Sequence, residues 1–188
     1  MNILKIVYDW PDKSNKVNFL APAPYELTIQ QAKLGNKIYV LCGNLNKTNL
    51  LNFNFKYTVG KNITVYNLPR GLKYFGPFLT SSVFVLPYYF YLKLFKKINL
   101  VYVQGHMSVW LLLYKKLFGF LDKTLFFGHF HILAKSREDK LTNNNQELDF
   151  FTKNFEYPLH KLSDYLTLKV CKKVFAVGKD IVQDVKKY

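Results

Sequence analysis

Short apolar runs alternate with helix-like segments along the chain, and this alternation leaves few folds open. Because each strand is followed by a helical or long connecting segment, the strands are expected to lie parallel in one sheet with helices on both faces. We therefore predict a single α/β domain with a Rossmann-like sheet over residues 1–188. The predicted strands are Ile3–Tyr8, Lys37–Cys42, Ile63–Leu68, Leu100–Gln104, Lys123–Gly128 and Lys173–Val177.

A long aromatic segment, Phe75–Lys97, separates the third predicted strand from the fourth. It carries no charge from Phe78 to Leu92, is interrupted by Pro87, and ends in a group of lysines. The uncharged stretch is shorter than the roughly 20 residues that span a bilayer. Its composition fits an interfacial element, with apolar side chains in lipid and lysines at the headgroups. It fits a buried helix pair equally well, and the sequence leaves both interpretations open.

The chain is strongly basic, with 27 Lys and Arg against 12 Asp and Glu and a formal net charge of +15. Such a positive field favours anionic partners, namely membrane headgroups, phosphorylated metabolites or nucleic acids. The lysines occur as scattered pairs, and RNP motifs, zinc-finger spacings and basic heptad helices are absent. We therefore expect no nucleic-acid partner, and an anionic membrane surface stays open as a partner.

Two nucleotide-binding motifs are missing from the sequence. Residues 9–27, which follow the first strand, read DWPDKSNKVNFLAPAPYEL and contain no glycine. A G-x-G-x-x-G fingerprint at this place is therefore excluded, and no Walker P-loop occurs elsewhere. These absences argue against an ordinary NAD-dependent enzyme and against a P-loop ATPase.

The two cysteines, Cys42 and Cys171, lie in a predicted strand and helix without metal-ligand spacing. We interpret them as buried, reduced thiols, which suits a cytosolic protein. The first apolar run is short and contains Lys5, so it is not predicted to be a signal peptide. We expect a cytoplasmic location, with the inner face of the cell membrane as a peripheral site.

Histidines follow the ends of two predicted strands. His106 follows the fourth strand, and His129 and His131 follow the fifth, with a Gly-His pair in both places. Because parallel strands bring their carboxyl ends to one edge, these histidines are expected where α/β sheets bind ligands. We predict substrate contact, with a structural role for one histidine as the alternative, and no metal site, because further ligands are few. By contrast, His160 is predicted to lie on the surface at the start of a helix.

Four stretches occur in an order and spacing known from one family. Tyr25–Val40 is similar to a helix and strand of pattern "EL…L…GH.V.V", with Asn36 in place of the usual histidine. Leu100–His106 is similar to a "D.VH.H" strand, Phe127–His131 to a "T.H" strand end, and Cys171–Val185 to an "AD.V.AVS" strand and helix. The chain thus resembles the amino-terminal domain of GT-B glycosyltransferases of the family 4 type.

The resemblance implies roles for individual residues. The histidine of the "T.H" strand end faces sugar and acceptor in the family, and the motif fits either His129 or His131. We prefer His129 as the catalytic position, where it would orient the substrate by hydrogen bonds. The resemblance implies no metal and no cofactor, since the nucleotide-sugar is a co-substrate. The implied substrate-binding residues are His106, His131, Glu26, Lys135 and Arg137, the last two as phosphate contacts.

The family has a second domain, which binds the nucleotide-sugar and carries an E-x7-E motif, and these 188 residues contain no counterpart of it. We therefore expect the acceptor-binding half of a glycosyltransferase of polysaccharide or glycolipid synthesis, inactive alone. Its acceptor would be a glycan or a lipid-linked molecule, and its donor would bind a second domain or subunit. The alternative is a non-catalytic, membrane-associated Rossmann-like binding or scaffolding protein.

Overall fold

The computed structural model describes residues 1–8, 10–11, 22–43, 56–69, 77–104, 106–130, 133–134, 150–176 and 178–186. Seven strands form one sheet in the order β3-β4-β2-β1-β5-β6-β7. Every neighbouring pair is parallel except β3 with β4, which is antiparallel. The strands are β1 (Asn2–Val7), β2 (Lys37–Cys42), β3 (Lys56–Val59), β4 (Ile63–Asn67), β5 (Leu100–Gln104), β6 (Leu125–Phe130) and β7 (Lys173–Ala176).

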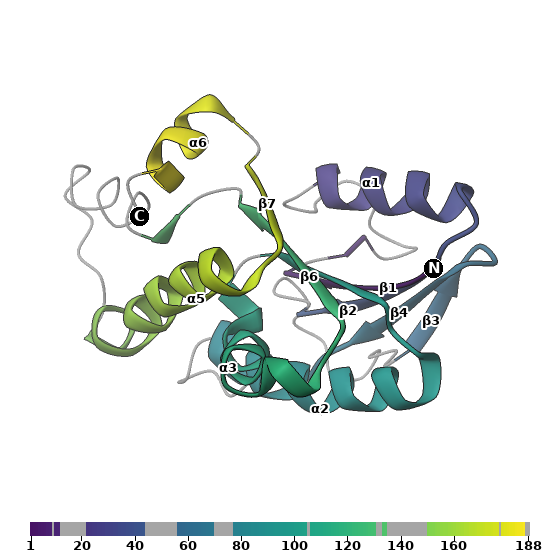
Figure 1. Cartoon of the computed structure of the whole chain (residues 1–188), viewed down its shortest axis with the longest axis horizontal. Helices are drawn as coiled ribbons and strands as arrows, with labels where there is room; N and C mark the ends of the chain where they lie inside the picture. Colours follow the sequence, from purple (N-terminus) through teal and green to yellow (C-terminus); the bar gives the residue numbers. More distant parts are fainter. Residues whose placement is uncertain are drawn as a thin grey trace.

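Helices cover both faces of this sheet (Figure 1). On one face lie α1 (Pro22–Lys33) and α6 (Lys179–Lys186). On the other face lie α2 (Pro77–Lys96), α3 (Val109–Phe118) and α5 (Tyr157–Val170). Short 3-10 turns flank α3, namely η2 (His106–Ser108) and η3 (Gly119–Leu121), and a π-helical turn, η4 (Thr152–Glu156), precedes α5. The predicted α/β fold with helices on both faces is confirmed.

The chain reverses its direction across the sheet at β1. From β1 it builds outward through β2 to β4, and α2 then carries it back to β5 on the other side of β1. The carboxyl ends of β1 and β5 therefore diverge into loops and helices on opposite faces. In open α/β sheets this switch point is where ligands bind.

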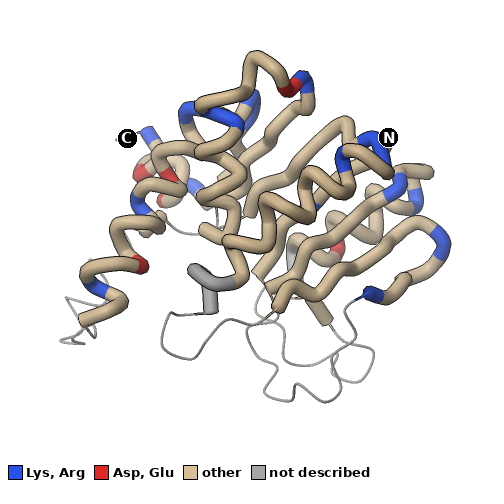
Figure 2. The backbone as a smooth tube through the Cα atoms, turned by 90° about the horizontal axis from the view of Figure 1, so that it is seen from below, with Lys and Arg blue, Asp and Glu red and all other residues tan. Residues whose placement is uncertain are grey.

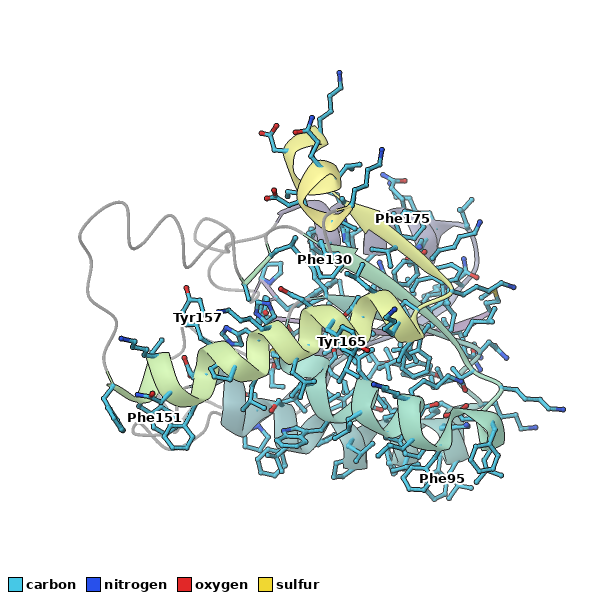
Figure 3. The ribbon with its side chains drawn as sticks, turned by 60° about the vertical axis from the view of Figure 1, so that its left-hand side comes forward. Phe95, Phe130, Phe151, Tyr157, Tyr165 and Phe175 are labelled. Atoms are coloured by element: carbon cyan, nitrogen blue, oxygen red, sulfur yellow. The ribbon has the colours of Figure 1, made fainter. Side chains whose placement is uncertain are left out.

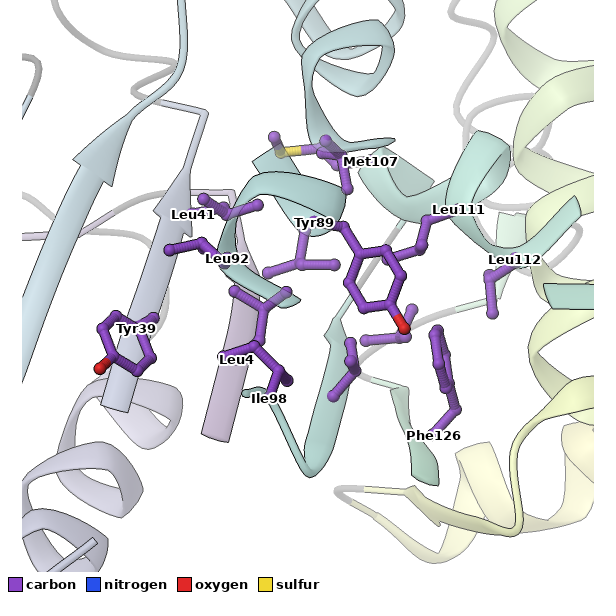
Figure 4. Close-up of a cluster of buried hydrophobic side chains, with 14 of the residues drawn as sticks. Leu4, Tyr39, Leu41, Tyr89, Leu92, Ile98, Met107, Leu111, Leu112 and Phe126 are labelled. Carbon is purple, nitrogen blue, oxygen red and sulfur yellow. The ribbon is translucent and has the colours of Figure 1, made fainter. Parts of the chain in front are cut away.

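Both faces of β1 are buried. Leu4 and Ile6 point into a large cluster beneath α2, α3 and α5, in which Tyr89, Leu92 and Phe126 also pack (Figure 4). Ile3 and Val7 point the other way, into a smaller cluster beneath α1. Burial on both faces explains why these strands appear in the sequence as continuous apolar runs.

The structure differs from the sequence prediction in three places. First, β3 is a strand that is not among the predicted ones, and it forms because its short KYTV run pairs with β4. Second, α2 continues through Pro87, since buried side chains on both sides of the proline hold the helix to the sheet. Third, Gly128 does not end its strand, which continues to Phe130.

Cys42 is buried and Cys171 is half-buried, and neither forms a disulfide. Burial raises the pKa of the Cys171 thiol to about 12. Within the described residues, none of the helices combines the length and the hydropathy needed to cross a bilayer.

Candidate functional site

A small pocket lies at the switch point, between the carboxyl ends of the central strands and the first turns of α1. It is open to about 10 Å³, room for a single water-sized group. Most of its wall is apolar, and its polar side chains come from three neighbouring strands. The lining residues are Lys5, Ile6 and Val7 of β1, Pro24 and Leu27 of α1, Tyr102 and Gln104 of β5, and His129 of β6.

His129 is the one predicted site residue that lines this pocket in the described chain. It is half-buried and pairs in register with Gln104 on one side and Phe175 on the other. The extension of β6 beyond Gly128 therefore fixes His129 as part of a strand, facing α1. A residue on a strand is held more rigidly than one on a loop, which favours a role in orienting a ligand.

Lys5 also lines this pocket, and it is not among the site residues predicted from the sequence. It lies in the middle of β1, is only 3% exposed, and places its ammonium group 5.2 Å from the centroid of the Tyr102 ring. The Tyr102 hydroxyl is held in turn by Gln31 of α1, at 3.4 Å. Burial lowers the pKa of Lys5 to about 7. The available signal was a lysine inside an otherwise apolar strand.

His106 lies at the same edge of the sheet but on the opposite face, beneath α5. Its Nε2 lies 3.1 Å from a carboxylate oxygen of Asp164, and its backbone N–H donates to the Tyr8 hydroxyl. The other Asp164 oxygen accepts a hydrogen bond of 2.7 Å from the Ala134 N–H. This buried network connects the ends of β1 and β5 to α5, and His106 is not among the residues that line the pocket at His129.

His160 is buried, at 5% exposure, so its predicted surface position is wrong. Its ring stacks on that of His106 at a centroid distance of 4.0 Å and an interplanar angle of 16°. His160 lies in the first turn of α5, on the side of the helix that packs against η2.

The remaining predicted site residues do not join the pocket in the described structure. Glu26 is exposed on α1 and does not line it. The other three, His131, Lys135 and Arg137, lie outside the described residues. In the described part of the chain, no group of three or more His, Cys, Asp or Glu residues could hold a metal ion.

A second surface feature lies on α2, whose outward face is apolar. We call this the α2 outer face, and Figure 3 shows Phe95 on it, pointing away from the sheet. Leu94 is 73% exposed and Phe95 63%, which is unusual for such side chains. The α2 outer face consists of Val83, Phe84, Pro87, Phe90, Tyr91, Leu94 and Phe95.

The surroundings of the α2 outer face are basic. Residues 77–125 contain six lysines and one acidic residue, Asp122, which is buried and paired with Lys93. Elsewhere on the described backbone, lysines occur in several elements, whereas Asp and Glu are few (Figure 2). Further exposed apolar residues, Phe118, Phe120 and Leu121, follow at the end of α3, which packs beside α2.

An aromatic groove of about 450 Å³ adjoins the α2 outer face. It is lined by Pro87, Tyr88 and Tyr91 of α2, together with Lys56 and Tyr66 from the edge of the sheet. The Lys56 ammonium lies 5.7 Å from the centroid of the Tyr66 ring. The groove thus combines aromatic walls with one cation, and it shares Pro87 and Tyr91 with the α2 outer face.

Comparison with known proteins supports the fold and extends no further. No protein family model and no curated protein sequence matches the chain. Among solved structures, a sucrose-phosphate synthase from Thermosynechococcus elongatus superposes with a TM-score of 0.69 at 11% identity, covering 100% of this chain and 45% of that one. A protein described as a putative UDP-N-acetylglucosamine 2-epimerase from Listeria monocytogenes gives 0.51 at 10% identity, covering 98% and 41%. The chain therefore spans less than half the length of these structures, and it has the fold of a GT-B half.

Proposed function

We propose that this chain is the acceptor-binding part of a glycosyltransferase that moves a sugar from a nucleotide-sugar to a glycan or a lipid-linked acceptor. One observation carries the proposal: a pocket lined by His129, Gln104 and Lys5 lies at the switch point of a domain that superposes, over its whole length, on less than half of a sucrose-phosphate synthase structure. The carboxyl edge of the sheet is then one wall of a cleft whose other wall binds the donor.

The roles of the pocket residues follow from their chemistry. His129 and Gln104 both carry groups that exchange hydrogen bonds with sugar hydroxyls, and they are neighbours across two strands. We assign to His129 the orientation of an acceptor hydroxyl, which requires a fixed side chain and no covalent intermediate. A nucleotide-sugar would be contributed by a second domain or subunit, so the chain alone would bind acceptor without transferring sugar.

Binding and turnover test this proposal separately. The purified chain is titrated with a panel of hexoses, hexose phosphates and short oligosaccharides by ligand-observed NMR, and it is assayed with common nucleotide-sugars. We expect a sugar from the panel to bind, and His129→Ala to lose that binding by about tenfold or more, the usual size of a lost polar contact. The control is Lys61→Gln in the exposed β3–β4 turn, at the opposite edge of the sheet. Efficient sugar transfer by the chain alone would refute the proposed division of labour.

We further propose that the protein docks on an anionic membrane surface through the α2 outer face. Exposed Leu94 and Phe95 would enter the interface, while nearby lysines meet the headgroups. The aromatic groove beside this face, with Lys56 at its wall, would then open toward the lipid and fit the chain of a lipid-linked acceptor. Docking also suits the alternative of a non-catalytic membrane-associated protein, which the turnover and sugar-binding assays separate from the enzyme.

Vesicle co-sedimentation tests docking. We expect binding to vesicles of phosphatidylglycerol and phosphatidylcholine, and its loss in Leu94→Ser/Phe95→Ser. The matched control is Leu34→Ser, because Leu34 is 80% exposed and follows α1 on the opposite face of the sheet. Equal losses for both variants would show that the α2 outer face has no special part in docking.

A further inference from the structure

Among the described residues, Lys5 is buried without a counter-charge. It is 3% exposed, and no ion pair or side-chain hydrogen bond joins its ammonium group to another described residue. The ammonium group lies 5.2 Å from the centroid of the Tyr102 ring. A methionine of similar length would fill the same space in β1 without the cost of dehydrating an ammonium group. Packing alone therefore does not account for a lysine here.

The position of Lys5 allows its ammonium group to meet a ligand. The side chain lines the switch-point pocket together with Gln104 and His129, which are hydrogen-bonding groups from the next two strands. Among the described residues, the titratable groups that line this pocket besides Lys5 are Tyr102 and His129, and none of the described carboxylates lines it. The described lining therefore carries either no charge or a positive charge while tyrosine is protonated.

The start of α1 has few backbone N–H groups to offer an anion in the pocket, so a side-chain cation is needed to bind one. Helix N-termini often bind anions through their first backbone N–H groups. In α1 the first and third residues are Pro22 and Pro24, which have no N–H, and Pro24 lines the pocket. The helix therefore offers fewer donors than usual, and Lys5 is the group that can supply the missing positive charge.

We propose that Lys5 is the cation of a subsite that receives one anionic oxygen of a ligand, carried by a phosphate or a carboxylate. The pocket has room for about one water-sized group, which matches a single oxygen rather than a whole phosphate. Gln104 and His129 would hold the same oxygen or the atom that bears it. The subsite rests on the proposed function only for the identity of the ligand, which would be an acidic or phosphorylated acceptor.

Binding of the anion would be coupled to uptake of a proton by Lys5. Because burial lowers the pKa of Lys5 to about 7, a large share of the side chain is neutral at physiological pH. An oxygen anion in the pocket favours the ammonium form, so the bound state holds one more proton than the free state over this pH range. Affinity is then expected to fall as the pH rises above 7.

The test follows the titration of Lys5 directly and uses no sugar. Protein labelled with ¹³C at lysine Cε is titrated from pH 5 to pH 10 in chloride, sulfate or acetate at equal ionic strength, and Lys5→Met identifies the Lys5 signal. We expect a midpoint near 7 in chloride, and an upward shift of about one pH unit or more in an oxyanion, equivalent to at least tenfold preference for the ammonium form. An upward shift in sulfate alone indicates a phosphate-like ligand, and an upward shift in acetate alone indicates a carboxylate. A shift in both salts indicates a site that accepts either group.

Three results would overturn the subsite. They are a midpoint that is the same in all three salts, a midpoint near 10 in chloride, and an oxyanion effect on neighbouring signals that persists in Lys5→Met. Lys61→Met serves as the control for loss of one charge at the opposite edge. If Lys5→Met fails to fold, the salt dependence of the titration midpoint in the wild type still tests whether the subsite binds an oxyanion. Failure of sugar binding with an intact salt effect would refute the proposed function and leave this subsite standing.

Discussion

Lys5 places a titratable charge at the centre of the sheet, and its effect on stability follows from the direction of its pKa shift. Burial lowers this pKa from 10.5 to about 7. Between these two values the unfolded chain binds more protons than the folded chain. The free energy of unfolding therefore rises with pH in this window, by about 1.4 kcal/mol per pH unit from this residue.

Lys5→Met is expected to stabilise the protein most at pH 7 and progressively less toward pH 10. The gain in the free energy of unfolding at pH 7 is on the order of several kcal/mol. Folding of the wild type at this pH either removes a proton from Lys5 or dehydrates its ammonium group, and the variant avoids both costs. Urea unfolding of both proteins at several pH values measures the difference, and subtraction removes the other titrating groups. A difference that does not change between pH 7 and pH 10 would contradict the buried position of the ammonium group.

Asp122 is a buried acidic residue that contacts three elements. Its carboxylate makes the free energy of unfolding fall at acid pH. Burial acts to raise its pKa, but hydrogen bonds from Lys93, Tyr89 and Thr124 outweigh it and lower the pKa to about 2. Its backbone carbonyl also accepts from Lys115 of α3. Asp122 thus connects three elements: its carboxylate joins α2 to the start of β6, and its backbone carbonyl joins them to α3.

Because the folded pKa of Asp122 lies below the unfolded value of 3.8, its charged form stabilises the fold above pH 3.8 and this contribution is lost as the pH falls to 2. Asp122→Asn is expected to lower the free energy of unfolding at pH 7 by about 2–4 kcal/mol, since it leaves Lys93 and Tyr89 without their partner. The deficit relative to wild type should shrink by about 2 kcal/mol between pH 5 and pH 2. A deficit that stays constant over this range, in thermal or urea unfolding, would contradict the ionised state.

At the scale of single residues, the sequence predicted which side chains lie at the carboxyl edge of the sheet better than it predicted what those side chains contact. His129 follows a predicted strand, so its place at the sheet edge followed from parallel pairing alone. Lys5 and Asp164 were missed because their significance depends on burial and on partners far away in the chain. Nothing local marks Asp164 as the partner of His106, 58 residues earlier.

At the scale of elements, the contact of α5 with β6 depends on a glycine. A Cβ atom at Gly128 would lie 2.4 Å from Cγ2 of Thr167, a distance that real contacts do not allow. Thr167 has little freedom to move, because it is buried and its hydroxyl donates to the Ser163 carbonyl at 2.8 Å. Gly128 is therefore retained for the close approach of the helix and not to end the strand.

Gly128→Ala is expected to lower the free energy of unfolding by about 1–3 kcal/mol, the usual effect of overpacking. Thr167→Ser removes the clashing methyl group and keeps the hydroxyl, so the double variant should be more stable than the sum of the single effects predicts, by about 1 kcal/mol. Chemical unfolding of the four proteins gives this coupling. Gly178→Ala is the control, since a Cβ atom there meets nothing within 4 Å. Simple additivity would show that the two residues do not compete for space.

Most elements could be predicted because burial on both faces gives the parallel strands continuous apolar runs. The exceptions share a physical cause, namely that tertiary contacts outweighed a local signal. The strand β3 is half exposed and short, and it forms because the edge of β4 offers it a partner. Pro87 would end an isolated helix, but Val85 and Tyr89 on either side of it are fully buried against the sheet.

At the scale of the whole molecule, the strand order brings chemistry from distant parts of the chain to one place. Lys5 lies about a hundred residues before Gln104 and His129 in sequence, and the three residues meet because β1 lies beside β5 and β5 beside β6. The α/β class could be predicted from the alternation of elements. The strand order could not, because no pattern in the sequence indicates which strand pairs with β1.

The whole molecule also determines how docking on a membrane would depend on salt. With a net charge of +15, long-range attraction to anionic vesicles is strong at 0.1 M salt and screened at 1 M, where the Debye length falls from about 10 Å to about 3 Å. The apolar contribution of the α2 outer face does not weaken with salt. We therefore expect wild-type affinity for phosphatidylglycerol vesicles to drop by more than tenfold between these salt concentrations without vanishing. Leu94→Ser/Phe95→Ser should abolish the part that remains at 1 M, because only apolar insertion survives screening. Binding that disappears completely at 1 M in the wild type would mean that charge alone attracts the protein, and the α2 outer face would then need a different partner.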